Sequence, residues 1–305
     1  MDFSHHGTPT KQWLDYLTVN PAAADDGLSG NDIAQAAALR QSVNGLRDAA
    51  TARLLDQSGM RERIAISTTF APSRHGREIP IRQYTPTARD ETKNQKTLVY
   101  FHGGGFLFGS ETSDDYLCAE ISLNLGITVL SVIYSHTPEH TFPAAHDDAA
   151  DVVRYLHENT AQLRISPEHG LAVLGLSAGA LLAAELVRHD RELARTSPQY
   201  RRLVTGVVFS IPWLIHHDNF PVDLFVSPEK CARIQCRDAP VIPQPRFKLF
   251  SDLMAAPDPA DTRMNPGLMP ESELEGWPRT GFVIAGMDPL RDDGLMFATK
   301  LKLVG

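Results

Sequence analysis

The chain has 305 residues, of which 42% are hydrophobic and 22% are charged. This is enough apolar material for one large core and an accessory segment, and it excludes a disordered or fibrous protein. The 37 acidic and 29 basic residues give a net charge of -8. Because no cluster of Lys and Arg appears in the sequence, we expect neither nucleic acid nor a membrane as a partner.

The number and spacing of the cysteines and the sequence of the first residues indicate the cellular compartment of the protein. The three cysteines, Cys118, Cys231 and Cys236, have neither the number of a disulfide framework nor the spacing of a zinc site. The first residues lack the basic start and apolar core of a secretory signal, and no apolar stretch is long enough to span a membrane. We therefore expect a cytoplasmic protein that uses no cofactor and no metal and acts on a small molecule.

In chain order, residues 1–60 are expected to be mostly helical, with amphipathic segments at 34–39 and 43–55. An antiparallel hairpin formed by 64–67 and 79–82 should follow. Short apolar runs then alternate with helical stretches, which is typical of a mainly parallel sheet covered by helices on both faces. These runs lie at 97–101, 128–133, 171–174, 204–209 and 282–285.

A candidate nucleophile lies in the segment Gly175-Leu176-Ser177-Ala178-Gly179, between the apolar run at 171–174 and a stretch of strong helix formers. Glycines at both ends keep Cβ atoms out of a sharp strand-to-helix turn, so the hydroxyl of Ser177 can project above the sheet. The alternative is an ordinary tight turn, because this five-residue pattern also occurs by chance.

The run His102-Gly103-Gly104-Gly105 directly follows the predicted strand at 97–101. A tetrahedral acyl intermediate needs hydrogen-bond donors aimed at its oxygen, and we expect the backbone N–H groups of Gly103, Gly104 and Ala178 to form this oxyanion hole. A glycine triplet alone is more often a plain loop. Two such motifs in this order, each after a strand, favour a functional site.

These residues resemble the hormone-sensitive-lipase-like family of α/β-hydrolases, and the similarity runs from about Lys96 to the last residue. It includes Pro-Glu-His at 138–140, Phe-Pro-Ala-Ala at 142–145 and Gly-Met-Asp-Pro-Leu-Arg-Asp-Asp-Gly at 286–294. The resemblance implies the α/β-hydrolase fold, a mainly parallel sheet with helices on both faces and a helical lid. It also implies that Asp288 is the acid of a catalytic triad.

The position of Asp288 agrees with this role independently of the family. It lies just past the apolar run at 282–285, at the end of a strand where ligands bind in an open α/β sheet. The alternative is that Asp288 caps the following helix, since Asp is a preferred N-cap residue. Asp292 and Asp293 fit that capping role better.

The general base is missing from its expected place. The triad of this fold runs in the order serine, acid, histidine, yet no histidine follows Asp288. His102 belongs to the oxyanion loop, and His216 and His217 are expected at the surface, so none of them is a good candidate for the base. We therefore expect a catalytic histidine to be absent, and the chain to stop before the strand and helix that would carry it.

The resemblance also predicts how the chain is divided into core and lid segments. We expect an N-terminal lid segment at 1–60, the hydrolase core at 61–212, a lid insertion at 213–270 and the rest of the core at 271–305. The insertion is rich in proline and aromatic residues, and its phenylalanines are expected mainly in core packing. The missing last strand would leave 282–285 as an open apolar edge, so copies of the chain are expected to associate there.

Three functions stay open. The first is a serine carboxylic-ester hydrolase that acts through an acyl-enzyme on a small, largely apolar ester and is impaired because its triad histidine is absent. The second is a non-catalytic protein that binds a small molecule, as plant gibberellin receptors do; they resemble this family and lack the histidine. The third is a dehydratase or other tailoring enzyme of the same fold.

Overall fold

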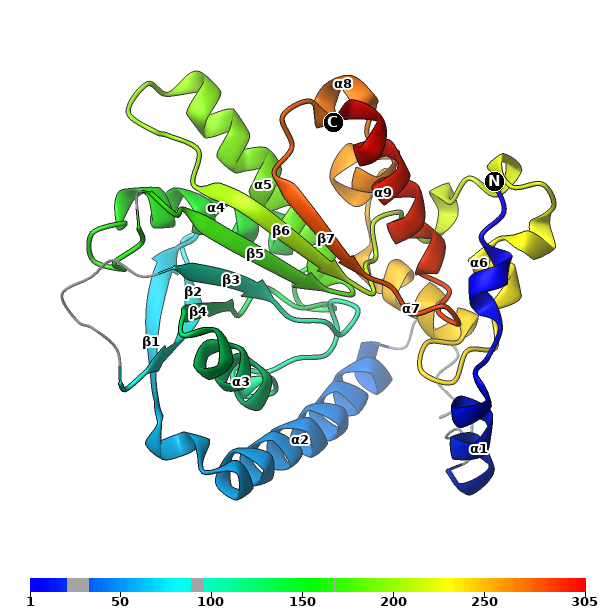
Figure 1. The fold of residues 1–305 in the computed structure, drawn as a ribbon, viewed down its shortest axis with the longest axis horizontal. Coiled ribbons are helices and arrows are strands. Elements are labelled where there is room, and N and C mark those ends of the chain that lie inside the picture. The colour runs from blue at the N-terminus through cyan, green and yellow to red at the C-terminus, as the bar shows by residue number, and fades with distance from the viewer. Residues whose placement is uncertain (21–32, 89–95, 167) are drawn as a thin grey trace.

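The computed structural model describes residues 1–20, 33–88, 96–166 and 168–305 (Figure 1). Within these ranges, seven strands form one sheet in the order β1-β2-β4-β3-β5-β6-β7. The pairs β1–β2 and β2–β4 are antiparallel, and all pairs from β4 to β7 are parallel. The strands are β1 (Ile64–Pro72), β2 (Glu78–Pro86), β3 (Thr97–Phe101), β4 (Thr128–Val132), β5 (Leu171–Leu176), β6 (Val204–Ser210) and β7 (Arg279–Val283).

This topology confirms the predicted fold class, an α/β-hydrolase fold built on a mainly parallel sheet. The boundaries of the last strand were wrong, because β7 starts at Arg279 and ends at Val283 rather than at Ala285. The reason is the length of its neighbour. β6 ends at Ser210, which pairs with Val283, and the chain leaves the sheet there.

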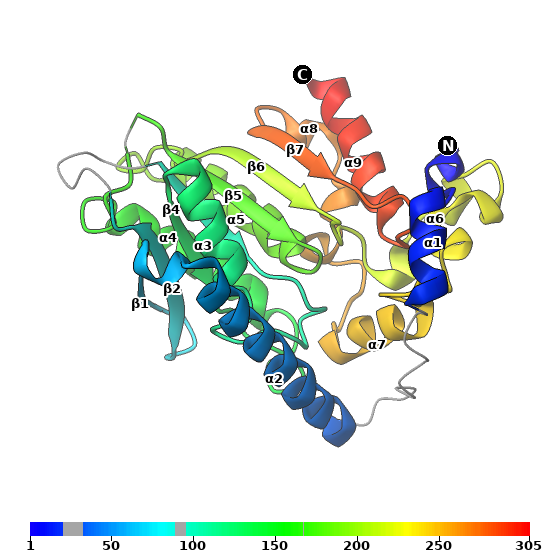
Figure 2. The ribbon, with the colours of Figure 1, turned by 60° about the horizontal axis from the view of Figure 1, so that its bottom comes forward.

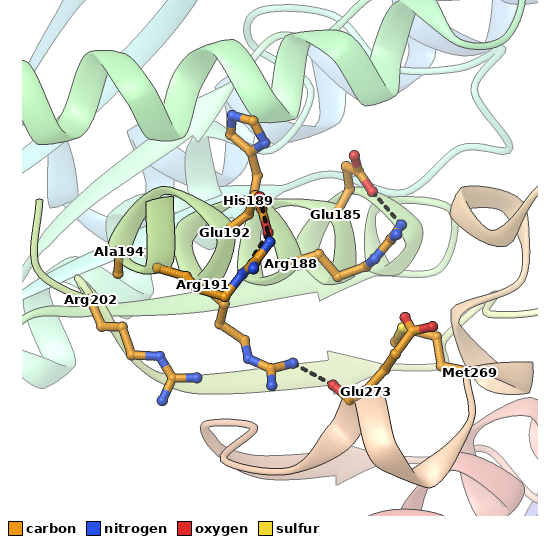
Figure 3. A pocket seen from close by; sticks show the side chains of 10 residues that line it. Glu185, Arg188, His189, Arg191, Glu192, Ala194, Arg202, Met269 and Glu273 are labelled. Carbon is orange, nitrogen blue, oxygen red and sulfur yellow. Dashed lines mark hydrogen bonds and ion pairs between the residues drawn. The ribbon is translucent and has the colours of Figure 1, made fainter. Parts of the chain in front are cut away.

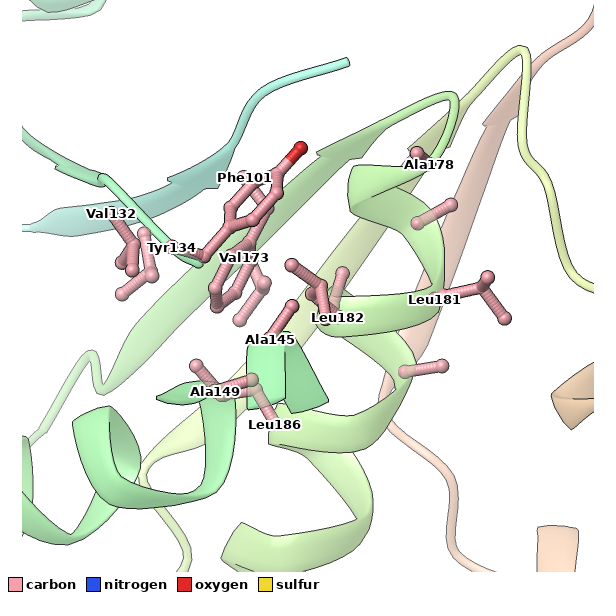
Figure 4. Close-up of a cluster of buried hydrophobic side chains, with 14 of the residues drawn as sticks. Phe101, Val132, Tyr134, Ala145, Ala149, Val173, Ala178, Leu181, Leu182 and Leu186 are labelled. Atoms are coloured by element: carbon pink, nitrogen blue, oxygen red, sulfur yellow. The ribbon is translucent and has the colours of Figure 1, made fainter. Parts of the chain in front are cut away.

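One face of the sheet is covered by three helices, α4, α5 and α9. Phe101 and Val173 point from the strands of this face toward Leu182 and other residues of α5, and all three side chains are fully buried (Figure 4). Phe297 of α9 continues the same cluster over β6. The helices are α4 (Ala144–Glu158), α5 (Gly179–Thr196) and α9 (Arg291–Val304).

The opposite face carries α3 (Asp115–Leu125), which packs over β2 and β4, and α2 (Ile33–Ser58) lies along α3 (Figure 2). Leu98, Tyr100 and Val129 form the apolar cluster beneath them. Over β6 and β7 the described chain leaves this face bare. The side chains there are exposed, Val208 by 36% and Val283 by 57%.

We expect copies of the chain to associate through this bare face and the free edge of β7, because an uncovered apolar edge strand invites pairing. Hydrogen exchange should be much faster at the amides of Val283 and Ile284 than at Val173 and Leu174 in the central strand β5. The Val283→Lys substitution should reduce association, measured by analytical ultracentrifugation. A monodisperse monomer with equal protection of both strands would contradict this expectation.

The N-terminal part contains α1 (Lys11–Val19) and the single long helix α2, not two separate amphipathic segments. Gly45 of α2 lies inside the second predicted segment and is exposed, and a Cβ added there would have no atom within 4 Å. An isolated exposed glycine only weakens a helix, so strong helix formers on both sides continue it. Residues 4–7 lie beside the lid insertion, where Gln235 donates a hydrogen bond to the carbonyl of Ser4 (2.9 Å) (Figure 1).

The segment 213–270 is built from short helices and turns rather than strands. Its phenylalanines are buried, as expected: Phe220, Phe225, Phe247 and Phe250. The segment's α-helices are α6 (Ala232–Gln235) and α7 (Gln244–Met254), followed by α8 (Glu271–Leu274) before β7. Short 3-10 turns lie at Ser4–Gly7, Met60–Glu62, His217–Asn219, Val222–Leu224, Pro228–Lys230, Thr262–Met264 and Pro266–Leu268. Across the described ranges, no helix combines the length and apolarity needed to cross a bilayer.

Candidate active site

Ser177 lies on the turn between β5 and α5, in a left-handed backbone conformation with a φ of +52°. Residues other than glycine rarely adopt this backbone conformation, so contacts with the surrounding structure must stabilise it at Ser177. The N–H of Ser177 donates to the carbonyl of Ser210 at 2.9 Å, and its own carbonyl accepts from the N–H of Ala180 at 2.9 Å. These bonds tie the turn to β6 on one side and to the first turn of α5 on the other.

The glycines that flank Ser177 have no room for a side chain. A Cβ on Gly175 would lie 2.5 Å from the carbonyl oxygen of Gly179, and a Cβ on Gly179 would lie 2.2 Å from that of Phe101. Helix α5 therefore lies closer to β3 and β5 than it could if a residue with a side chain replaced Gly175 or Gly179. This close approach is the steric reason for the glycine spacing in the motif.

The glycine run after β3 lies directly against this turn. A Cβ on Gly103 would lie only 3.3 Å from the Cβ of Ser177. The N–H groups of Gly103, Gly104 and Ala178 have no hydrogen-bond acceptor among the described residues. The fold thus brings the two motifs together, with three unpaired N–H donors beside the Ser177 side chain.

The other two positions of the run are crowded as well. Gly104 has a φ of +137°, and a Cβ there would lie 2.2 Å from the carbonyl oxygen of Phe108. Gly105 has a φ of +61°, and a Cβ there would lie 2.3 Å from the ring of Phe250 on α7. Phe250 also meets Phe108 edge to face, with ring centroids 5.6 Å apart. The lid insertion therefore covers the oxyanion loop directly.

His102, the first residue of the run, is 2% exposed. Its Nδ1 lies 3.0 Å from the carbonyl oxygen of Gly103, and the hydroxyl of Tyr134 donates to the His102 carbonyl at 2.8 Å. Burial lowers the pKa of His102, so the imidazole is neutral at pH 7. Its contacts are those of a side chain that supports the loop.

Asp288 lies in the loop between β7 and α9, at the same edge of the sheet as Ser177, with the end of β6 between them. The side chain is half-buried, and its Oδ1 accepts a hydrogen bond from the N–H of Leu290 at 2.7 Å. Burial raises the pKa of this carboxyl group. In the described parts of the chain, no side chain pairs with it.

The capping role considered for Asp292 and Asp293 was wrong. Both are completely buried, and no side chain caps α9. Asp293 accepts hydrogen bonds from the N–H groups of Leu214 and Ile215, each at 3.0 Å. Asp292 accepts from the N–H of Ala232. The two carboxylates thus fasten the lid insertion to the start of α9.

Arg233 is a site residue that the sequence analysis missed. It forms a buried ion pair with Asp293 at 2.9 Å and donates to the carbonyl of Pro289 at 2.8 Å, next to Asp288. Its guanidinium also lies over the ring of Phe247, 4.3 Å from the centroid. Nothing in the sequence distinguished Arg233 from the other charged residues of the insertion, and its partner lies 60 positions away.

The surface position expected for His216 was also wrong. It is 3% exposed, its Nδ1 accepts the N–H of Asp218, and its burial lowers its pKa. Of the histidines in the described ranges, none forms a hydrogen bond with Ser177 or Asp288. The described residues also hold no group of three or more potential metal ligands.

A mainly apolar cavity of about 390 Å³ lies beside the acid loop. It is enclosed by the N-terminal segment, the lid and the loop after β7, with His6, Trp13, Ile242, Met287 and Asp288 among its lining residues. Ligand pockets of small molecules fall in this range of volumes. His6 therefore lines the same cavity as the candidate acid.

A second pocket of about 700 Å³ lies between α5 and α8 and contains none of the predicted site residues (Figure 3). Three of its arginines, Arg188, Arg191 and Arg202, have hydrogen-bond partners within the protein. Arg191 donates to the carbonyls of Glu273 and Glu275, each at 2.5 Å, and Arg188 pairs with Glu185 at 3.0 Å. The hydrogen bonds of Arg191 attach α8 to α5, while the pair of Arg188 and Glu185 lies within α5.

Comparison with known proteins identifies the family of the fold. The sequence pattern of the alpha/beta hydrolase fold matches residues 98–305. An ethyl acetate hydrolase of Pseudomonas putida is 39% identical over 132 residues, which are 42% of this chain and 41% of that protein. The structure of a bacterial heroin esterase has a TM-score of 0.71 at 28% identity, over 90% of this chain and 80% of that one. The structure of a vibralactone cyclase has a TM-score of 0.83 at 25% identity, over 98% of this chain and 84% of that one.

Proposed function

Because the chain belongs to the hormone-sensitive-lipase-like family of the α/β-hydrolase fold, we propose that it is a serine carboxylic-ester hydrolase acting through an acyl-enzyme on a small, largely apolar ester. Carboxylesterase-like ancestry follows from the family and its relatives. One observation carries the finer proposal. Ser177 lies on a strained strand-to-helix turn, directly against the unpaired N–H groups of the glycine run.

In the proposed reaction, Oγ of Ser177 attacks the carbonyl carbon of the ester. The oxygen of the tetrahedral intermediate accepts hydrogen bonds from the N–H groups of Gly103, Gly104 and Ala178. The bond to the alcohol then breaks, and the alcohol leaves with a proton. Water attacks the acyl-enzyme, releases the carboxylic acid and returns the proton to Ser177.

Removal of the proton from the Ser177 hydroxyl is the slow step that we expect in this reaction. Attack requires a base near the hydroxyl of Ser177, and Asp288 would orient that base, as the acid of a triad does. In the described part of the chain, no residue occupies the position of the base, since no histidine forms a hydrogen bond with Ser177 or Asp288. We therefore propose that the 305-residue chain is an impaired hydrolase that keeps its nucleophile and oxyanion hole.

An aryl phosphonate ester should label Ser177, because the hydroxyl keeps the N–H donors that stabilise the pentavalent transition state. Labelling should be slower than in an enzyme with a complete triad, because the hydroxyl lacks its base. Peptide mapping by mass spectrometry identifies the modified residue, and the Ser177→Ala variant is the control. Labelling of a different serine, with Ser177 untouched, would refute the proposed nucleophile.

A cyclase is the second candidate, and the high TM-score of 0.83 over 98% of this chain favours it. In such a reaction, a hydroxyl of the acyl group itself would attack the acyl-enzyme carbonyl and release a ring instead of an acid. Aryl esters of a hydroxy acid separate the two activities, since the product is either the free hydroxy acid or its lactone. Ligand binding in a thermal-shift screen without any turnover would instead favour the non-catalytic binding protein.

A further inference from the structure

Helix α2 contacts Gly109, in the chain just after the oxyanion loop, through Asn44, and its Asp48 accepts a hydrogen bond from the hydroxyl of the next residue, Ser110, at 2.5 Å. The Nδ2 of Asn44 donates to the carbonyl of Gly109 at 2.7 Å, and its Oδ1 accepts the N–H of Gly109 at 2.9 Å. The two bonds engage both ends of the amide group, so they fix the orientation of the two peptide groups on either side of Gly109. The two residues lie 65 positions apart in the sequence.

Gly109 in turn supports His102. Its φ is +127°, and a Cβ at this position would lie 2.1 Å from Cε1 of the His102 ring. The ring therefore rests on the Gly109 backbone, while its Nδ1 lies 3.0 Å from the carbonyl oxygen of Gly103. A shift of Gly109 would move the ring and, with it, the Gly103 peptide.

The turn between these two contact points is closed by hydrogen bonds of its own. The carbonyl of Gly104 accepts from the N–H of Leu107 at 3.0 Å and from that of Phe108 at 2.8 Å. These hydrogen bonds join the Leu107–Phe108 end of the turn to Gly104, the residue after Gly103, so the turn forms one hydrogen-bonded unit. That unit carries two of the three N–H groups of the proposed oxyanion hole, those of Gly103 and Gly104.

We propose that Asn44 is a positioning residue for the oxyanion hole, acting from the N-terminal helix through Gly109 and His102 on the N–H groups of Gly103 and Gly104. The inference rests on the proposed function, because it assigns this alignment to the binding of a developing oxyanion. Neighbouring contacts attach α2 to the core independently. The Oγ1 of Thr51 donates to the carbonyl of Ser113 at 2.8 Å, and Arg47 pairs with Asp114 at 2.9 Å.

The test compares Asn44→Ala with Thr51→Val, a matched control that removes one hydrogen bond from the same helix without touching the oxyanion loop. The reaction is phosphonylation of Ser177 by an aryl phosphonate ester, in which the Oγ–P bond forms, the P–O bond to the aryl group breaks and the hydroxyl proton passes to solvent. Loss of a complete oxyanion donor costs about 100- to 1000-fold in rate. For misaligned but present donors, we expect Asn44→Ala to lower the labelling rate constant about tenfold, with little change in the affinity for the reagent.

A second reagent with P=S in place of P=O makes the test specific. Sulfur accepts hydrogen bonds poorly, so the oxyanion hole contributes less to its reaction, and the effect of Asn44→Ala should shrink. A purely structural role would slow both reagents equally. The Asn44→Asp variant keeps the acceptor for Gly109 but replaces the donor with a repelling oxygen, so it should show the same dependence on the reagent.

The outcomes separate this inference from the proposed function. Equal slowing with both reagents, or equal slowing in Thr51→Val, would overturn the positioning role of Asn44 while the labelled Ser177 would still support the hydrolase proposal. If the unmodified protein were not labelled at Ser177 at all, the proposed function would fail first. Circular dichroism and thermal unfolding of each variant show whether the fold is retained.

Discussion

The 305-residue chain should hydrolyse short-chain aryl esters about a millionfold more slowly than an enzyme with a complete triad, and only about 1000- to 10,000-fold faster than the uncatalysed reaction. Loss of the base from a complete Ser-His-Asp triad costs about a millionfold in turnover in a serine protease, and the oxyanion hole and binding leave only a residual acceleration. Here the candidate nucleophile Ser177 and the candidate acid Asp288 have no histidine partner among the described residues. The measurement is the initial rate of nitrophenyl ester hydrolysis at neutral pH.

Added imidazole should accelerate this reaction, because a small base from solution can take the proton of the Ser177 hydroxyl. The acceleration should disappear in the Ser177→Ala variant, which controls for hydrolysis by imidazole itself. High activity without imidazole would refute the missing-base explanation, and substitution of His6, His102, His216 and His217 would then identify the base.

The Arg233→Met substitution should lower the free energy of unfolding by about 3–5 kcal/mol, because it leaves the carboxylate of Asp293 buried without its cation. Both side chains are almost fully enclosed, with exposed fractions of 6% and 0%. Burial already raises the pKa of Asp293 to about 6, and Arg233 opposes that rise. Urea unfolding monitored by tryptophan fluorescence measures the change.

Two further measurements test the physical reason for this loss. Without the arginine, the pKa of Asp293 in the folded state rises further above its unfolded value, so the penalty is present at neutral pH and is lost as the pH falls and the carboxyl group protonates. The double variant with Asp293→Asn removes the buried charge and keeps the acceptor for Leu214 and Ile215. It should recover most of the lost stability. A full loss in the double variant would instead assign the effect to the contacts of Arg233 with Phe247 and Pro289.

Local patterns in the sequence predicted the positions of the core strands and the place of the candidate site, whereas the order of the strands in the sheet came from the structure. Short apolar runs between helical stretches predict a parallel sheet, because strands buried on both faces need apolar residues at every position. The glycines around Ser177 were equally informative, since a turn with no room for Cβ atoms admits no other residue. Errors at this level concerned the extent of elements: pairing with β6 decides where β7 ends, and α2 is one helix rather than two segments.

Only the tertiary structure decided which distant residues support the site. Asn44 and Gly109 are 65 positions apart, and Arg233 and Asp293 are 60 positions apart, so no local periodicity relates them. Burial of a polar residue such as His216 follows from what packs over it and not from its neighbours in sequence. A hydrogen bond or ion pair between two elements depends on the angle and register at which they pack. These are set when the whole core closes, which is why a side chain on the N-terminal helix and a loop beside the nucleophile become one unit.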